Sequence, residues 1–181
     1  MTDGRTDPDR ELAEAKVAEA AEARRRHRRE RDLLIEESTF RGVLTGLVDS
    51  RRSIVAVGAG GRRTTGVLVE IGSDVVVMET TAGLIAAIRI TSVLAIETAD
   101  LGAAWSSTEQ SSTKHRTFAD IVADVAGTGE VVALDLATGV HLDGEVLGVG
   151  QDLVIVRAGG SQSIYVALDS LNELAWSTSV G

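Results

Sequence analysis

The chain has 181 residues, of which 44% are hydrophobic and 3% aromatic, which is enough apolar material for one ordinary domain or two small ones. It has no cysteine, which excludes a disulfide framework or a thiolate metal site and is typical of a reducing compartment, so we expect a cytoplasmic protein. The net charge of −9 is uneven, with 9 basic and 11 acidic side chains in residues 1–38, 6 and 5 in residues 39–99, and 3 and 11 in residues 100–181, so the last segment would repel a phosphate backbone.

The N-terminal segment is polar and charged. Residues 1–9 include the only proline, Pro8, and are expected to be a disordered leader, since they lack the apolar run of a signal peptide. Residues 10–38 are rich in Ala, Glu, Arg and Leu and contain no Gly or Pro, which predicts a long charged helix. No stretch of the chain reaches the roughly 18 apolar residues of a membrane span, so we expect a soluble protein with no membrane partner.

An arginine cluster lies inside this predicted helix. Its members are Arg24, Arg25, Arg26, Arg28, Arg29 and Arg31. One interpretation is an arm for RNA, DNA or an acidic protein partner, and such arginines would contact phosphates without sequence specificity. The other interpretation is a solvated helix face, because acidic residues on both sides of the cluster balance its charge.

A short amphipathic helix is predicted twice. In the first, apolar side chains recur with the spacing of one helix face, at Phe40, Val43, Leu44, Leu47 and Val48. In the second they are Phe118, Ile121, Val122 and Val125. Thr117 and Asp120 have the spacing of a capping box, with Thr117 as the N-cap and Asp120 bonding back to it.

Five predicted strands follow each of these helices, separated by turns rich in Gly, Ser and Thr. The first set comprises residues 54–57, 64–71, 74–80, 84–90 and 93–98. The second set comprises residues 131–135, 143–149, 152–157, 163–168 and 171–175. Laid 78 positions further on, Gly150 falls under Gly72 and Asp152 under Asp74, so we interpret the chain as a tandem duplication.

The pattern of a short helix and five strands, with a tight turn before the fifth, resembles the Sm-like small β-barrel fold of Sm, LSm and Hfq proteins. Gly66 and Asp74 stand where the first block of that family has its glycine and aspartate, and residues 88–93 resemble the second block, with Arg89 as its arginine. The whole arrangement is also similar to a group of actinobacterial proteins often labelled Fis-family regulators, although the sequence contains no helix-turn-helix pattern.

The resemblance covers residues 39–176. It implies a mainly β fold with helices, in which two tandem Sm-like five-stranded barrels, each preceded by a short helix, follow the long N-terminal charged helix. The implied boundaries are a first barrel at 39–99, a linker at 100–116 and a second barrel at 117–177.

The sequence departs from the family at the positions that contact RNA. Ile90 and Thr91 replace the glycine and asparagine of the second block, and Val75 and Val76 stand where the base-binding loop needs a polar residue. In the second copy, residues 166–169 have lost the arginine as well. RNA binding at the usual pore loops is therefore disfavoured.

Candidate catalytic and metal-binding residues are scarce. His27, His115 and His141 are far apart and have no metal-ligand spacing, and no nucleophile motif is present. We therefore expect no catalytic residue, no metal and no cofactor, and a protein that is not an enzyme.

A glycine-rich segment at residues 58–63, GAGGRR, lacks the GKS or GKT ending of a phosphate loop and precedes a predicted strand, so we expect a hairpin turn there. Arg62 and Arg63 at its tip, together with Arg51 and Arg52, are predicted to form a basic patch on one end of the first barrel.

The leading hypothesis is a non-enzymatic interaction and assembly module. The two barrels would pair through residues 163–168 and 93–98 within one chain and leave an open strand edge at each end for a protein partner or for self-assembly, while the Arg-rich helix contacts a partner. The alternative is an RNA- or DNA-binding regulatory protein that uses the arginine cluster, the basic patch and Arg89.

Overall fold

The computed structural model of the chain describes residues 16–17, 19–26, 28–29, 32, 38–99 and 115–177. The chain divides into two units, Met1–Thr39 and Phe40–Gly181, and the strands found in the described residues belong to the second. Within the second unit we call residues 40–97 the first half and residues 118–177 the second half.

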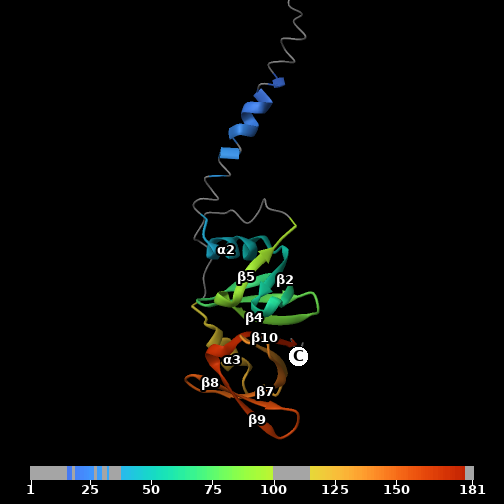
Figure 1. Cartoon of the computed structure of the whole chain (residues 1–181), viewed down its shortest axis with the longest axis vertical. Coiled ribbons are helices and arrows are strands. Elements are labelled where there is room, and N and C mark those ends of the chain that lie inside the picture. The colour runs from blue at the N-terminus through green and yellow to red at the C-terminus, as the bar shows by residue number, and fades with distance from the viewer. Residues whose placement is uncertain are drawn as a thin grey trace, which may run out of the picture. The chain divides into compact units, whose positions relative to one another are not determined.

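Each half consists of one short helix and five strands in the same order (Figure 1). The first half contains α2 (Phe40–Ser50), β1 (Ser53–Gly58), β2 (Arg63–Ile71), β3 (Val75–Thr80), β4 (Leu84–Arg89) and β5 (Val93–Glu97). The second half contains α3 (Phe118–Val125), β6 (Val131–Leu136), β7 (His141–Val149), β8 (Leu153–Ala158), β9 (Gln162–Ala167) and β10 (Leu171–Ser177). A 3-10 turn precedes the last strand of each half, at Ile90–Ser92 and at Leu168–Ser170. The ten predicted strands and two predicted short helices are confirmed, with small shifts at their ends.

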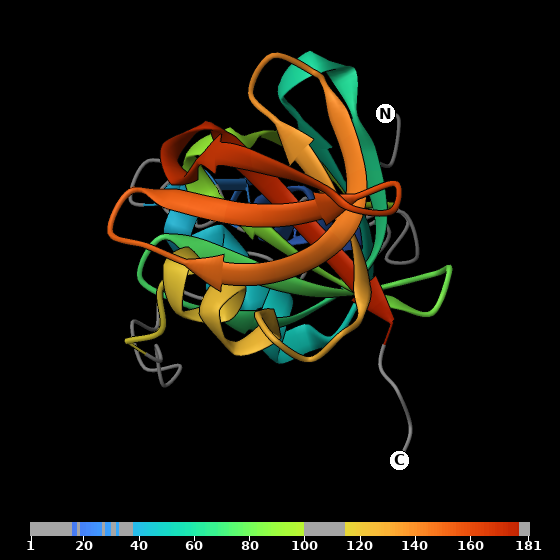
Figure 2. The same cartoon turned by 90° about the horizontal axis from the view of Figure 1, so that it is seen from below.

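The prediction of two five-stranded barrels behind a long N-terminal helix is wrong. All ten strands form one open antiparallel sheet in the order β5-β1-β2-β3-β4-β10-β6-β7-β8-β9. Closing the first half on itself would require β4 to bond to β5. Instead β4 bonds to β10, from Leu84 opposite Ser177 to Ile88 opposite Glu173. Figure 2 shows the strands from below, and β7 and β8 are visibly curved.

The predicted pairing of residues 163–168 with residues 93–98 is also wrong, because the strands concerned, β9 and β5, lie at opposite ends of the sheet order. The opposite pair of strands, β4 and β10, joins the halves. One open edge is left at each end of the sheet, but these edges are β5 and β9, the strands that were predicted to pair, and not β4 and β10.

The helices that have described bounds are short, with 11 residues in α2 and 8 in α3. Residues 16–17, 19–26, 28–29 and 32 are helical, and the rest of the predicted helix at 10–38 lies outside the described residues, apart from Ser38, which is not helical. The predicted leader at 1–9 and most of the predicted linker, residues 100–114, also lie outside them.

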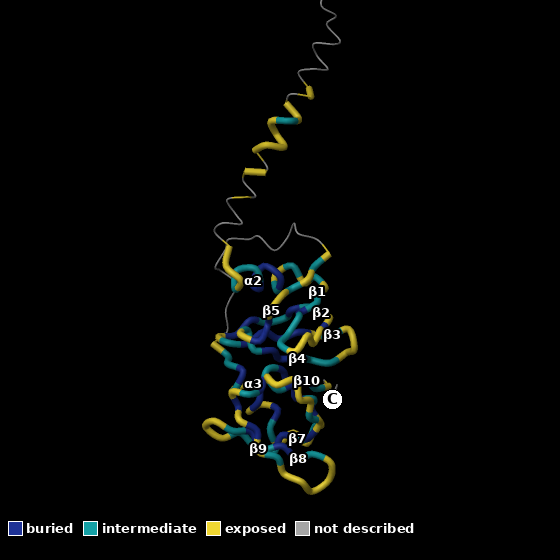
Figure 3. Tube along the Cα trace, viewed as in Figure 1, coloured by how far each residue is buried: buried dark blue, intermediate teal, exposed yellow. Residues whose placement is uncertain are grey.

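The two hydrophobic cores share the middle strands of the sheet. Val76 and Met78 pack into the core under α2, whereas Val75 and Val77 pack into the core under α3. These four residues of β3 are buried in succession, which is the pattern of a strand covered on both faces. Figure 3 shows the buried residues gathered around these strands, with exposed hairpin tips outside them. Neither half can therefore be a free-standing barrel, since each core needs side chains from the other half.

The strand registers of the two halves are equivalent at a spacing of 78 positions. Ile54 pairs with Gly66, and Val132 pairs with Gly144. The register shift in β2 between Leu68 and Glu70 recurs in β7 between Val146 and Gly148. The hairpin bond from the Gly58 N–H to the Arg62 carbonyl likewise recurs from Leu136 to Val140. A residue of one half therefore has a defined counterpart in the other.

Candidate interaction sites

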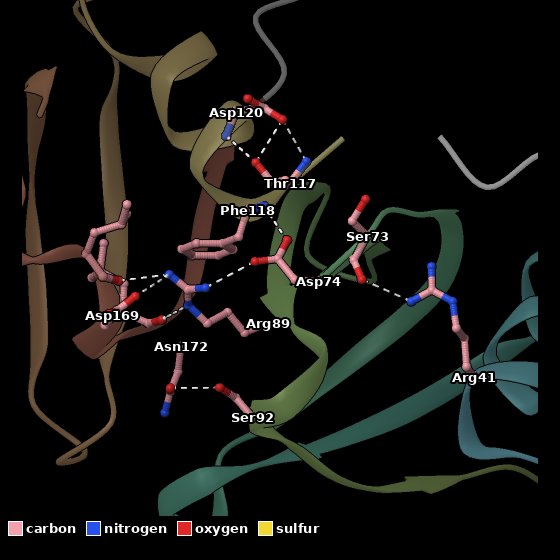
Figure 4. A network of polar contacts seen from close by, with 12 residues as sticks. Arg41, Ser73, Asp74, Arg89, Ser92, Thr117, Phe118, Asp120, Asp169 and Asn172 are labelled. Carbon is pink, nitrogen blue, oxygen red and sulfur yellow. Dashed lines mark hydrogen bonds and ion pairs between the residues drawn. The ribbon is translucent and has the colours of Figure 1, made fainter. Parts of the chain in front are cut away.

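The junction between β4 and β10 is where the two halves meet, and we call it the inner junction. Arg89, at the end of β4, makes several polar contacts across it (Figure 4). Its Nε donates to the carbonyl oxygen of Leu171 at 2.8 Å, and its Nη2 donates to that of Leu168 at 3.0 Å. The guanidinium carbon lies 4.6 Å from the ring centroid of Phe118, a cation–π distance. Arg89 therefore clamps the turn before β10 and the start of α3.

Asp74 also connects the two halves, because it contacts both Arg89 and the start of α3 (Figure 4). Its Oδ2 accepts a hydrogen bond from Arg89 Nη1 at 3.2 Å, and its Oδ1 accepts one from the Phe118 backbone N–H at 2.7 Å. A carboxylate at the first turn of a helix is favourable, because the N–H groups there have no partner inside the helix. Helix α3 begins with the predicted capping box, which is confirmed: Thr117 accepts from the Asp120 N–H, and Asp120 accepts from the Thr117 N–H.

A second ionic group lies near the same end of the inner junction, because Glu173 pairs with Ile88, the residue before Arg89. Asp135 on β6 and Glu173 on β10 are cross-strand neighbours, and both are buried. Two carboxylates in this arrangement repel each other. Arg62 of the first half offsets the repulsion, with its Nε at 2.7 Å from Asp135 Oδ2 and 3.4 Å from Glu173 Oε2. We call Arg62, Asp135 and Glu173 the ionic triad.

Two further groups complete the surroundings of the ionic triad. Thr64 donates to the Glu173 carboxylate at 3.2 Å, and His141 Nδ1 lies 2.8 Å from Asp135 Oδ1. Burial raises the pKa of Glu173, and the hydrogen bond to Asp135 raises the pKa of His141. Sequence reasoning missed His141 because its partner is six positions away, across a hairpin whose register determines the contact.

A cavity of about 330 Å³ opens beside the ionic triad, between the β1–β2 and β6–β7 hairpins. Its lining includes backbone of Gly60 and Gly139 as well as Ser92 and Asn172, which are joined by a hydrogen bond of 2.7 Å. Within the described ranges no three His, Asp or Glu side chains are arranged to hold a metal ion. The carboxylates in the lining lie within ion-pair distance of Arg62 and His141, so their partners come from the chain itself.

The free edges of the sheet are a different kind of site. In the described part of the chain, β5 has a partner only in β1, and β9 only in β8. Both strands expose a large apolar side chain: Leu94 on β5 is 67% exposed and Tyr165 on β9 is 72% exposed. Unpaired strand edges with exposed apolar side chains are suited to pairing with another strand.

The predicted basic residues are not all brought together. Arg24, Arg25, Arg26, Arg28 and Arg29 are exposed helical residues of the N-terminal unit, and Arg31 lies outside the described residues. Arg51 and Arg52 precede β1, whereas Arg62 and Arg63 follow it, so the two pairs lie at opposite ends of that strand.

Carboxylates accompany three of the predicted basic residues in the folded unit. Arg62 belongs to the ionic triad, Arg89 bonds to Asp74, and Arg63 Nη1 donates to Glu97 Oε1 at 2.8 Å. Their contact with a nucleic acid remains a prediction.

A comparison of the sequence with protein-family models finds no match, and a comparison with curated proteins finds none either. None of the described helices has the length and apolar composition needed to cross a membrane.

Proposed function

We propose that this protein is a non-enzymatic interaction module that binds protein through the two free edges of its sheet. The observation that carries the proposal is the contrast between the inner junction and the ends of the sheet. Inside the chain, the fourth strand of one half pairs with the fifth strand of the other, while β9 and β5, the counterparts of β4 and β10, end the sheet.

We also infer that the halves are two copies of one unit, which supports the proposal. Equivalent registers, equivalent register shifts and equivalent turns recur at the same spacing. Each half joins the other through one strand, β4 in the first half and β10 in the second. The counterparts of these two strands, β9 and β5, are the strands that end the sheet. Such open edges invite strand addition.

Light scattering of the full chain over a range of concentrations tests this proposal. The wild-type chain is expected to associate, and Leu94→Lys and Tyr165→Lys should each reduce association, because a lysine on an edge disfavours strand pairing. Val131→Lys is the matched control, since Val131 is 69% exposed but lies on β6, which has partners on both sides. A chain that stays monomeric and retains no protein partner in a pull-down contradicts the proposal.

A second candidate function is RNA or DNA binding through the N-terminal arginine cluster. It is supported by the exposure of Arg24, Arg25, Arg26, Arg28 and Arg29 on helical backbone. This function requires affinity for single-stranded RNA that falls steeply with salt concentration and disappears when residues 1–38 are deleted. A pull-down with and without nuclease separates the two functions.

A further inference from the structure

Four of the five large apolar residues that are exposed in the described part of the folded unit are counterparts of inner-junction residues. Among the described residues, six large apolar side chains are exposed: Val17, Phe40, Leu94, Val131, Val140 and Tyr165. At the spacing of 78 positions, Phe40 corresponds to Phe118, Leu94 to Asn172, Val140 to Arg62 and Tyr165 to Ala87. Each of these four counterparts contacts the other half at the inner junction.

The change in burial is large at the positions of Phe40 and Tyr165. Phe118 and Ala87 are 0% exposed at the inner junction, whereas Phe40 is 42% exposed and Tyr165 is 72% exposed. Leu94 is 67% exposed and Val140 is 49% exposed. Scattered exposed apolar residues are ordinary, but these four occupy positions whose counterparts contact the other half at the inner junction.

We propose that a second copy of this chain docks its first half onto the second half of the first copy, forming an outer junction between β9 of one copy and β5 of the other. This inference rests on the proposed function and names the partner and the register. The inner register, in which Ala87 pairs with Leu174, places Tyr165 of one copy opposite Ile96 of the next. Cross-strand pairs of an aromatic and a β-branched side chain are favourable.

The side chains that surround the two strands change from ionic to apolar between the junctions. At the inner junction Arg62 contacts Asp135 and Glu173. The residues at the same positions of the outer junction are Val140 from one copy and Val57 and Ala95 from the other. An apolar group thus replaces each member of the ionic triad.

The polar bond between Ser92 and Asn172 changes in the same way, since their counterparts are Ser170 and Leu94. The arginine clamp is also absent from the outer junction. The counterpart of Arg89 is Ala167, which would lie beside Phe40 of the next copy. The outer junction is therefore apolar and lacks charge-assisted bonds, so it is expected to be weaker and reversible.

This difference in chemistry distinguishes the two junctions from each other. If β9 of another copy replaced β4 beside β10, Val140 would take the place of Arg62 and leave the buried carboxylates Asp135 and Glu173 without that partner. Burying a charge without its partner is costly, so the ionic triad favours the pairing of β10 with β4 of the same chain. The two kinds of junction therefore alternate along a head-to-tail assembly.

The test converts the outer junction into a copy of the inner one in the full chain. Val140→Arg places a guanidinium opposite Val57 and Ala95, and Ala95→Glu places a carboxylate opposite Val140. Each single variant should weaken self-association at least about tenfold, because each introduces an unpaired charge. The double variant Val140→Arg with Ala95→Glu should restore association towards the wild-type level, since its two new charges pair across the junction. Sedimentation velocity over a concentration series measures all three.

Val131→Arg provides the control for adding an arginine to an exposed valine, because the counterpart of Val131 is Ser53, outside the junction. Association of both single variants at the wild-type level overturns the inference, and so does a double variant that associates no better than the singles. If the inference is overturned in this way but Leu94→Lys and Tyr165→Lys abolish association, the strand edges still act as proposed, with a different register or partner. A monomeric wild-type chain that binds no protein instead removes the proposed function.

Discussion

Arg89 Nε donates a hydrogen bond to the carbonyl oxygen of Leu171 at 2.8 Å, which ties the last residue of β4 to the first residue of β10. The arginine comes from the first half and the carbonyl from the second. The sequence presents Arg89 as a residue that contacts nucleic acid, because its neighbours resemble a block that does so in the Sm-like proteins. In the folded unit the Arg89 side chain is only 16% exposed and all three of its nitrogens have oxygen partners.

Replacing Arg89 with methionine should therefore destabilise the folded unit. Arg89→Met keeps an unbranched side chain but removes the donors to the carbonyl oxygens of Leu168 and Leu171. Leaving these part-buried acceptors without a partner is expected to cost about 2–4 kcal/mol, as measured by urea denaturation. Arg63→Met is the control and should scarcely change stability, since the Arg63–Glu97 pair is exposed on both sides. Equal stability of Arg89→Met and wild type would contradict the clamp.

The elements of the fold were predictable because they depend on local pattern. The spacing of Phe40, Leu44 and Leu47 and the Thr117–Asp120 capping box placed both helices correctly. The way in which the strands join depends on long-range pairing, which local pattern does not encode. A signal was nevertheless present: residues 75–78 are apolar in succession, where a strand with one solvent-facing side would alternate. Such a run favours a strand covered on both faces, and this explains why separate barrels do not form.

Two strand glycines are required for close approach between neighbouring strands. A Cβ on Gly66 would lie 2.1 Å from the Glu79 carbonyl oxygen, and one on Gly144 would lie 2.5 Å from that of Arg157. Gly66→Ala and Gly144→Ala should each destabilise the sheet by at least about 2 kcal/mol in urea denaturation, because the contacts are with backbone that cannot rotate away. Gly148→Ala is the control on β7, since nothing lies within 4 Å of its added Cβ. A Gly148→Ala variant as unstable as the other two would count against this explanation.

The ionic triad was hidden from sequence reasoning for a different reason. Arg62 and Asp135 belong to different halves, and Glu173 reaches them only because β10 lies between β4 and β6. Arg62 was assigned to an exposed basic patch, since its neighbour Arg63 and the glycines before it indicate a hairpin tip. The hairpin prediction holds, and the pairing of the halves determines what the tip contacts.

Stability should fall as the pH rises through the range in which Glu173 loses its proton. Its pKa is raised above the ordinary value of 4.5 by burial, so between 4.5 and the folded-state pKa the folded protein binds more protons than the unfolded chain. Relative to wild type, Glu173→Gln should gain stability as the pH rises above 4.5, because glutamine has no proton to lose. Thermal unfolding of both proteins over a pH series measures the difference.

His141 adds a second fall in stability at higher pH. Its pKa is raised from 6.5 by Asp135, so its contribution is complete below 6.5 and is lost as the pH rises through the folded-state pKa. Both proteins retain His141, so the difference between them isolates Glu173. Glu79→Gln, at an exposed position of β3, controls for the substitution itself. A difference between Glu173→Gln and wild type that stays constant with pH would argue against titration of the buried carboxyl.

The N-cap of α3 offers a test at the level of a single helix end. Thr117→Ala removes the oxygen that accepts the Asp120 N–H and should lower the free energy of unfolding by about 1 kcal/mol. Thr117→Ser keeps that oxygen and should stay close to wild type, which separates the cap bond from the loss of a methyl group. Because Asp74 also binds the Phe118 N–H, the start of α3 retains one acceptor in either variant, so the helix should shorten only at its end. Urea denaturation measures the loss of stability, and amide hydrogen exchange at Ala119 and Asp120 locates it. An equal loss in Thr117→Ala and Thr117→Ser would show that the cap bond contributes nothing measurable.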